Sequence, residues 1–126
     1  MANTSELRLY AIVNREALAN AKGNRGKMHA QAGHAFLHAW WDAERRFREI
    51  AYRYRDTQAA LKIVLAAENA AELQDMYERI KPICGCTLVV DAARTVFAEP
   101  TITFLGIGPI AREDAPEWLQ ALKPLI

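Results

Sequence analysis

Apolar residues gather in four short runs along the chain, and polar or turn-forming residues bound each run. The runs cover residues Leu7–Val13, Leu61–Ala66, Cys86–Val90 and Thr101–Ile107. Runs of this length that are rich in β-branched or aromatic residues are typical of strands. The pattern therefore predicts four strands.

The segments between these runs contain mostly good helix formers. Residues 27–54 hold no proline and only one glycine, which predicts a long helix that bends or breaks near Ile50. Asn69 can cap a second helix. This helix is expected to end at Lys81, because the proline that follows cannot continue it. A third helix is expected over residues 114–123, with a proline in its first turn.

This order of elements predicts a mixed sheet covered by helices. Strands that alternate with helices favour parallel pairing, whereas the link between the third and fourth strands is too short for a crossover helix. One strand is therefore expected to run antiparallel to its neighbours. The predicted fold class is a three-layer α/β/α sandwich around a four-stranded mixed sheet, and Gly106–Pro109 is expected to end the fourth strand. At 126 residues the chain is predicted to form a single domain over residues 1–126.

The formal net charge of +1 hides a local excess of basic residues. Between residues 45 and 55 there are five arginines and one acid, Glu49. The arginines are Arg45, Arg46, Arg48, Arg53 and Arg55. This segment predicts one basic face that could meet a polyanion such as RNA, although a solvated helix face would have the same composition.

Two further features limit the class of protein. No apolar run approaches the roughly 20 residues that a membrane-spanning helix needs, and the first residues lack a signal-peptide pattern, which predicts a soluble, cytoplasmic protein. Cys84 and Cys86 are separated only by Gly85, so they form neither an easy disulfide nor a complete zinc site. We interpret both cysteines as small apolar residues at the start of a buried strand.

The first group of candidate functional residues lies at the start of the long predicted helix. Lys27, Gln31, His34 and His38 are spaced four, three and four apart, so they share one helix face. The free N–H groups of a helix N-terminus, together with the lysine, would attract a phosphate or a carboxylate. The alternative is that Lys27 is solvated and that the histidines only cap the helix or pack against the core.

Two sharper interpretations of this segment fail. Gly23–Met28 lacks the glycine spacing of a phosphate-binding loop and the hydroxyl residue after its lysine. His34 and His38 have the spacing of a zinc pair, but the glutamate of that motif is replaced by Ala35 and no third ligand is evident. We therefore predict a site without metal.

The second group follows the third strand. Asp91 comes directly after three apolar residues, at the carboxyl end of a strand, where α/β sheets bind their ligands. Arg94 and Thr95 follow, and Thr101 and Thr103 begin the next strand. An acid there could orient a hydroxyl or a water. The alternative is a turn in which Asp91 bonds to its own backbone and pairs with Arg94 on the surface.

The two groups together resemble the type 2 peptidyl-tRNA hydrolases. Three blocks carry the resemblance, and their order and spacing also fit that family. The blocks here are G-K-M-H-A-Q-A-G-H-A over residues 26–35, D-A-A-R-T over 91–95 and T-I-T-F-L-G-I-G-P over 101–109.

The resemblance implies an enzyme that hydrolyses the ester between peptide and tRNA in peptidyl-tRNA, without a metal or another cofactor, as a homodimer. It implies Lys27, Asp91 and Thr95 as the catalytic group. The residues that would line the site are Gln31, His34, Arg94, Thr101 and Thr103. In this scheme Lys27 holds a phosphate or the developing oxyanion, and Asp91 orients the attacking water.

The chain also departs from the family pattern. Ala93 stands where the family has glycine, Val96 stands where it has glutamine, and Glu99 precedes the proline of the loop. These departures favour an alternative function, a binding module of the same fold without catalysis that recognises a nucleic acid, a protein or a small molecule. Retention of Lys27, Asp91 and Thr95 favours the enzyme. The side chains of Lys27 and Asp91 are then expected to converge on one cleft.

Overall fold

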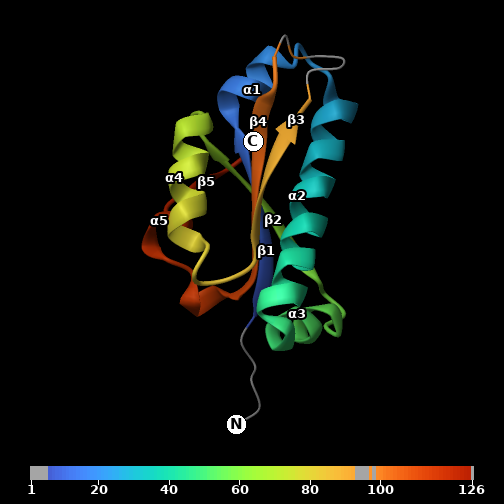
Figure 1. Cartoon of the computed structure of the whole chain (residues 1–126), viewed down its shortest axis with the longest axis vertical. Coiled ribbons are helices and arrows are strands. Elements are labelled where there is room, and N and C mark those ends of the chain that lie inside the picture. The colour runs from blue at the N-terminus through green and yellow to red at the C-terminus, as the bar shows by residue number, and fades with distance from the viewer. Residues whose placement is uncertain (1–5, 93–96, 98, 126) are drawn as a thin grey trace.

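The structure, a computed structural model, describes residues 6–92, 97 and 99–125. It is a mixed α/β fold in which a five-stranded mixed sheet packs against helices (Figure 1). The strands are β1 (Leu7–Asn14), β2 (Leu61–Ala67), β3 (Cys86–Asp91), β4 (Thr101–Ala111) and β5 (Lys123–Pro124). The helices are α1 (Arg15–Asn20), α2 (Arg25–Arg46), α3 (Arg48–Arg55), α4 (Ala70–Ile80) and α5 (Glu117–Gln120), with a short 3₁₀ turn at Arg112–Asp114.

The strand order in the sheet is β3-β4-β1-β2-β5. β1 and β2 are parallel, whereas β4 runs antiparallel to both of its neighbours, β1 and β3. The prediction of four strands is thus confirmed, and so is the prediction that one of them runs antiparallel to its neighbours. The prediction of a four-stranded sheet was wrong, because β5 adds a fifth strand that pairs with Leu65 and Ala66 of β2. A strand of two residues is too short to leave a periodic signal in the sequence.

Helices lie on both sides of the sheet. Figure 1 shows α4 and α5 on one side of the strands and α2 and α3 on the other. On the first side Leu73 and Ile80 of α4 and Leu119 of α5 belong to one buried cluster with side chains of β1, β2 and β4. On the second side Ala35 of α2 packs with Phe104 of β4 in another. Neither α2 nor any other described helix is long and apolar enough to cross a membrane.

Small residues let α2 lie very close to the sheet. Ala35, Ala39 and Ala43 recur every four residues, and all three are buried. A Cβ atom placed on Gly106 of β4 would overlap the backbone carbonyl of Ala35. A Cβ atom placed on Gly85, just before β3, would likewise overlap Ala39 and Ala43. The position of α2 is therefore set by backbone contact rather than by deformable side chains.

The long predicted helix is two helices. The helical conformation ends at Phe47, which has φ −139° and ψ 60°, and α3 begins at the next residue. The break falls before the expected bend near Ile50. It allows α3 to fold back, so that Ala51 and Tyr54 are buried and the Trp40 indole donates to the Ala51 carbonyl at 2.9 Å. Burial of Tyr54 in a cluster with Leu7 and Leu9 of β1 outweighs the helix propensity of the segment.

The C-terminal part also differs from the sequence-based prediction. β4 does not end at Gly106–Pro109 but continues through these residues to Ala111. The pairing with β1 shifts register there, which accommodates a proline that has no N–H to donate. The last helix was predicted over residues 114–123 but is shorter in the structure, where α5 covers only Glu117–Gln120.

The interpretation of the cysteines is confirmed. Cys84 and Cys86 are free thiols, and both are buried at the start of β3. Burial raises the pKa of the Cys84 thiol to about 12 and that of Cys86 to about 11. Both thiols are therefore uncharged at neutral pH and serve as packing groups.

Asp42 connects the C-terminal half of α2 to the start of β3. Its carboxylate accepts a hydrogen bond from the Cys86 N–H at 3.0 Å and pairs with Arg45 and Arg46. Arg46 also donates to the carbonyls of Lys81 and Cys84, at 2.8 Å and 3.0 Å. Burial acts to raise the pKa of Asp42, but the hydrogen bonds from Arg46 and Cys86 and the arginine charges outweigh it, so the pKa is lowered.

We expect Asp42→Asn to lower the free energy of unfolding by about 1–2 kcal/mol at pH 7, since it removes charge-assisted hydrogen bonds that are partly screened by solvent. A lowered pKa means that the stabilisation is present above the unfolded-state pKa, near 3.8, and is lost as the pH falls through the folded-state value. Urea unfolding of both proteins between pH 3 and pH 8 would measure how the difference in unfolding free energy depends on pH. This range, ~5 pH units, is wider than the titration of a single carboxyl group. A difference that stays constant over this range would contradict the assignment to the Asp42 charge.

Candidate functional site

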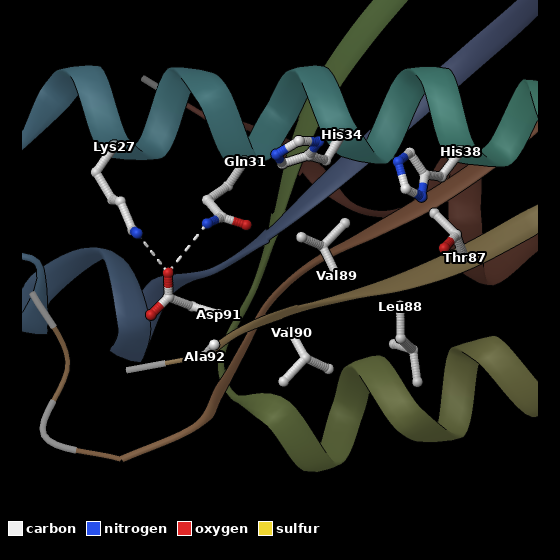
Figure 2. Close-up of a pocket in the computed structure, with 10 residues that line it drawn as sticks. All are labelled: Lys27, Gln31, His34, His38, Thr87, Leu88, Val89, Val90, Asp91 and Ala92. Carbon is white, nitrogen blue, oxygen red and sulfur yellow. Dashed lines mark hydrogen bonds and ion pairs between the residues drawn. The ribbon is translucent and has the colours of Figure 1, made fainter. Parts of the chain in front are cut away.

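Lys27 and Asp91 form an ion pair between α2 and β3. The Lys27 Nζ lies 2.6 Å from Asp91 Oδ1, so the expectation that the two side chains converge on one cleft is confirmed (Figure 2). Asp91 follows the apolar residues of β3, and its side chain is 3% exposed, whereas that of Lys27 is 22% exposed. α2 begins two residues before Lys27, where the Asn24 side chain accepts a hydrogen bond from the Lys27 N–H. The acid is thus buried and the cation is reachable from solvent.

Gln31 links this pair to β4. Its Nε2 donates to Asp91 Oδ1 at 3.2 Å, and its Oε1 lies 3.2 Å from the hydroxyl of Thr103. The same hydroxyl lies 3.3 Å from the carbonyl oxygen of Val89. Thr103 has no partner in the β3–β4 pairing, because Val89 is opposite Phe104 and Val90 is opposite Ile102. This bulge turns the Thr103 hydroxyl toward α2. The hydroxyl thereby orients the Gln31 amide, and the amide in turn orients the Asp91 carboxylate.

An open cleft of about 380 Å³ lies beside the ion pair. Its walls come from α2 and from consecutive residues of β3 and the position after it (Figure 2). Lys27, Gln31, His34 and His38 line it from α2, and the two histidines point from the helix toward β3. Gln31 is also buried, in line with Ala35, Ala39 and Ala43, so the predicted polar face of α2 includes one residue that packs against the sheet.

The remaining candidates have different positions. Thr101 is opposite Asp91 on β4, but its hydroxyl donates to the Glu99 carbonyl at 2.8 Å. Glu99 itself is exposed. Arg94 and Thr95 lie outside the described residues, and so do Ala93 and Val96. The structure therefore brings together Lys27, Gln31, Asp91 and Thr103, with His34 on the wall of the same cleft.

Comparison with known proteins identifies the family. A sequence model of the family described as "Peptidyl-tRNA hydrolase PTH2" matches residues 7–125. The chain belongs to the PTH2 family. It is 32% identical to a peptidyl-tRNA hydrolase of Methanococcus vannielii over 117 residues, which cover 91% of this chain and 97% of that protein. A peptidyl-tRNA hydrolase of Methanopyrus kandleri is 35% identical over 94 residues, 74% of this chain and 79% of the relative.

Two residues of this PTH2 family member that support the site were not predicted from the sequence. Asn14, at the end of β1, is 2% exposed, and its side chain donates to the Ile102 carbonyl at 2.8 Å while accepting from the Ala17 N–H. It thereby starts α1 and holds β4 beside Thr103. Thr87 lines the cleft from β3. The period of two along a strand places Thr87, Val89 and Asp91 on one face, which could have identified it.

The basic face predicted over residues 45–55 lies at the C-terminal end of α2 and in α3, whereas Lys27 lies in the first turn of α2; Figure 1 shows α3 beside the end of α2 that is remote from α1. Several of its guanidinium groups are already engaged, because Arg45 and Arg46 pair with Asp42 and Arg55 pairs with Asp56. Contact of this face with RNA stays a prediction. Among the residues that the structure describes, no group of three His, Cys, Asp or Glu side chains is placed to hold a metal ion.

Proposed function

We propose that this chain hydrolyses the ester between the peptide and the terminal ribose of peptidyl-tRNA. Membership of the PTH2 family supports this activity. The single structural observation that carries the proposal is the contact between Lys27 and Asp91 at the wall of an open cleft. In the reaction, water adds to the ester carbonyl carbon and the bond to the ribose oxygen breaks. The products are a peptide carboxylic acid and a tRNA whose ribose hydroxyl regains its proton.

Lys27, Asp91 and Thr95 form the catalytic group in this proposal. The Lys27 ammonium carries three donors, of which one is directed at Asp91, so the others can meet the oxyanion that develops on the ester carbonyl. Asp91 holds the ammonium in place and, together with Thr95, orients the attacking water. Gln31 and Thr103 position the Asp91 carboxylate. His34, Arg94 and Thr101 complete the surface that contacts the substrate.

The RNA part of the substrate lies at the N-terminal end of α2 in this proposal. Lys22 and Arg25 are exposed beside Lys27, at the positive end of the helix. Phosphate groups of the tRNA acceptor end would be attracted to this corner. We further propose that residues 1–126 form a single domain, that the protein acts in the cytoplasm and that it forms a homodimer. Exposed Leu37 on α2, beside an apolar hollow of about 650 Å³, provides surface for the dimer contact.

A release assay tests the function directly. Purified protein is incubated with N-acetyl-aminoacyl-tRNA that is labelled in the acyl group, and the released acid is measured against a protein-free control. We expect release well above the spontaneous rate, together with loss of release in Asp91→Asn. Release that never exceeds the control would refute the proposed function. Release that is unaffected by Asp91→Asn would leave the function in place and refute the assigned site.

A further inference from the structure

β3 is an edge strand, and the alternation along it determines which backbone groups point outward. It pairs with β4 on one side and begins the strand order of the described sheet. Gly108 N–H donates to the Gly85 carbonyl at 2.8 Å, which places the backbone of Gly85 toward β4. The next N–H, that of Cys86, instead donates to Asp42. By alternation, the N–H and C=O groups of Leu88 and Val90 point away from β4.

A continuous hollow follows this edge. The cleft beside Lys27 adjoins a second hollow of about 460 Å³, and both are lined by His38, Thr87 and Leu88. The second hollow extends to Trp41 and Arg45 near the end of α2. We call the two together the edge cleft. Figure 2 shows its first part, where β3 runs between α2 and α4 and Val90 projects on the side opposite the histidines.

The charge of the edge cleft does not suit a polyanion. Each charged side chain that the described residues contribute to it is paired, Lys27 with Asp91 and Arg45 with Asp42. The net charge of the lining is therefore zero when the histidines are neutral. The exposed cations Lys22 and Arg25 lie at or just before the N-terminal end of α2, whereas the edge cleft extends from Lys27 toward the C-terminal end of that helix. Charge thus separates a face for the RNA from a neutral cleft for the acyl group.

We propose that the edge cleft binds the peptide part of peptidyl-tRNA as an added strand beside β3. This inference rests on the proposed function and names the part of the substrate that the cleft accepts. With the ester at Lys27 and Asp91, the peptide runs back along β3 toward Cys86, parallel to that strand. Main-chain hydrogen bonds to Leu88 and Val90 recognise any peptide whatever its side chains. Asp42 already occupies the Cys86 N–H, so the added strand ends there.

The first test uses peptide length. We expect kcat/KM to rise from N-acetyl-aminoacyl-tRNA to a tetrapeptidyl-tRNA by about tenfold, since each main-chain hydrogen bond contributes a factor of about 2 to 12. The increase should stop beyond about four residues, the length of peptide that the strand can accompany. A single N-methyl group at the second or the third residue from the ester should lower kcat/KM at one of these positions only. This difference arises because only alternate residues of an added strand face its neighbour.

The second test changes the enzyme. Val90 is 56% exposed and its N–H points away from β4, so Val90→Pro removes a donor to the peptide without removing a bond of the sheet. We expect the ratio of kcat/KM between tetrapeptidyl-tRNA and N-acetyl-aminoacyl-tRNA to fall toward one in Val90→Pro and to persist in Val90→Ala. The ratio controls for any general loss of activity, and the unfolding midpoint of each variant shows whether the fold is retained.

The outcomes separate the two proposals. Hydrolysis of every substrate with the same kcat/KM, whatever the peptide length or methyl position, would overturn the peptide site and leave the function intact. A second outcome is activity that does not depend on peptide length, falls in Arg45→Ala and decreases steeply with salt concentration. This outcome would place RNA in the edge cleft and would also overturn the inference. Failure to hydrolyse any of these substrates would refute the proposed function, and the peptide site with it.

Discussion

Replacing Lys27 by methionine should lower kcat/KM for peptidyl-tRNA by about 10²- to 10³-fold, the loss typical of removing one preorganised donor to an oxyanion. Methionine keeps much of the apolar stem that lines the cleft and removes the ammonium that lies 2.6 Å from Asp91 Oδ1. Because the proposed role of that ammonium is greatest in the transition state, kcat should fall more than KM rises. Single-turnover release of labelled N-acetyl-amino acid measures the effect.

The same substitution should also affect stability, and this needs a control. Without Lys27, the carboxylate of Asp91 stays buried with the Gln31 amide as a neighbour, and breaking a buried pair costs up to about 3 kcal/mol at a site that is partly open to solvent. The double variant Lys27→Met/Asp91→Asn removes both charges and should recover most of that stability. It should nevertheless remain inactive. Activity in the double variant close to that of the parent would show that the pair is structural.

Gly106→Ala should be the most damaging small substitution in the sheet. The added Cβ atom would overlap the backbone carbonyl of Ala35, and no side-chain rotation can relieve a contact with backbone. α2 must therefore move away from β4, which also lengthens the contacts from Gln31 to Thr103 and from Lys27 to Asp91. We expect the free energy of unfolding to fall by about 1–3 kcal/mol or more, and activity to fall with it. Urea unfolding and the release assay measure the two effects.

Gly33→Ala is the matched control for this experiment. The chemical change is identical, but Gly33 is an exposed residue in the interior of α2 with nothing near the position of its Cβ atom. Alanine should therefore raise the free energy of unfolding by about 0.5–1 kcal/mol through its higher helix propensity. If both alanine variants had the same stability, the close contact between α2 and β4 would not be a determinant of the fold.

Local patterns in the sequence were sufficient to predict most elements of the fold. The β-branched runs marked β1 to β4, and Asn69 marked the start of α4, where its side chain accepts from the Glu72 N–H. Features that depend on contacts between distant segments were not predictable. The break at Phe47 follows from the burial of Tyr54 against β1, and β5 exists because it reaches the edge of β2.

The site was predictable for a different reason. Lys27 and Asp91 were candidates because each occupies the end of an element, where α/β proteins bind ligands, and the resemblance to the family then favoured them over a solvated lysine and a surface turn. The spacing of Gln31 placed it on the same helix face as Lys27, and it indeed contacts Asp91. Asn14 was missed because its two bonds join segments that are distant in sequence, β1 and the start of β4. A polar residue at the end of an apolar strand was the available signal.

The close fit of α2 against β4 restricts how the length of this protein can vary. Ala35 lies over Gly106 and Gln31 bonds to Thr103, so two neighbouring points of the helix are matched to two points of one strand. Inserting or deleting one residue between Lys27 and Ala35 would rotate Lys27 by about 100° around the helix axis and away from Asp91. The turn that precedes α2 carries no such restriction. Homologous chains should therefore differ in length before residue 25 and keep a constant spacing between the positions of Lys27 and Ala35.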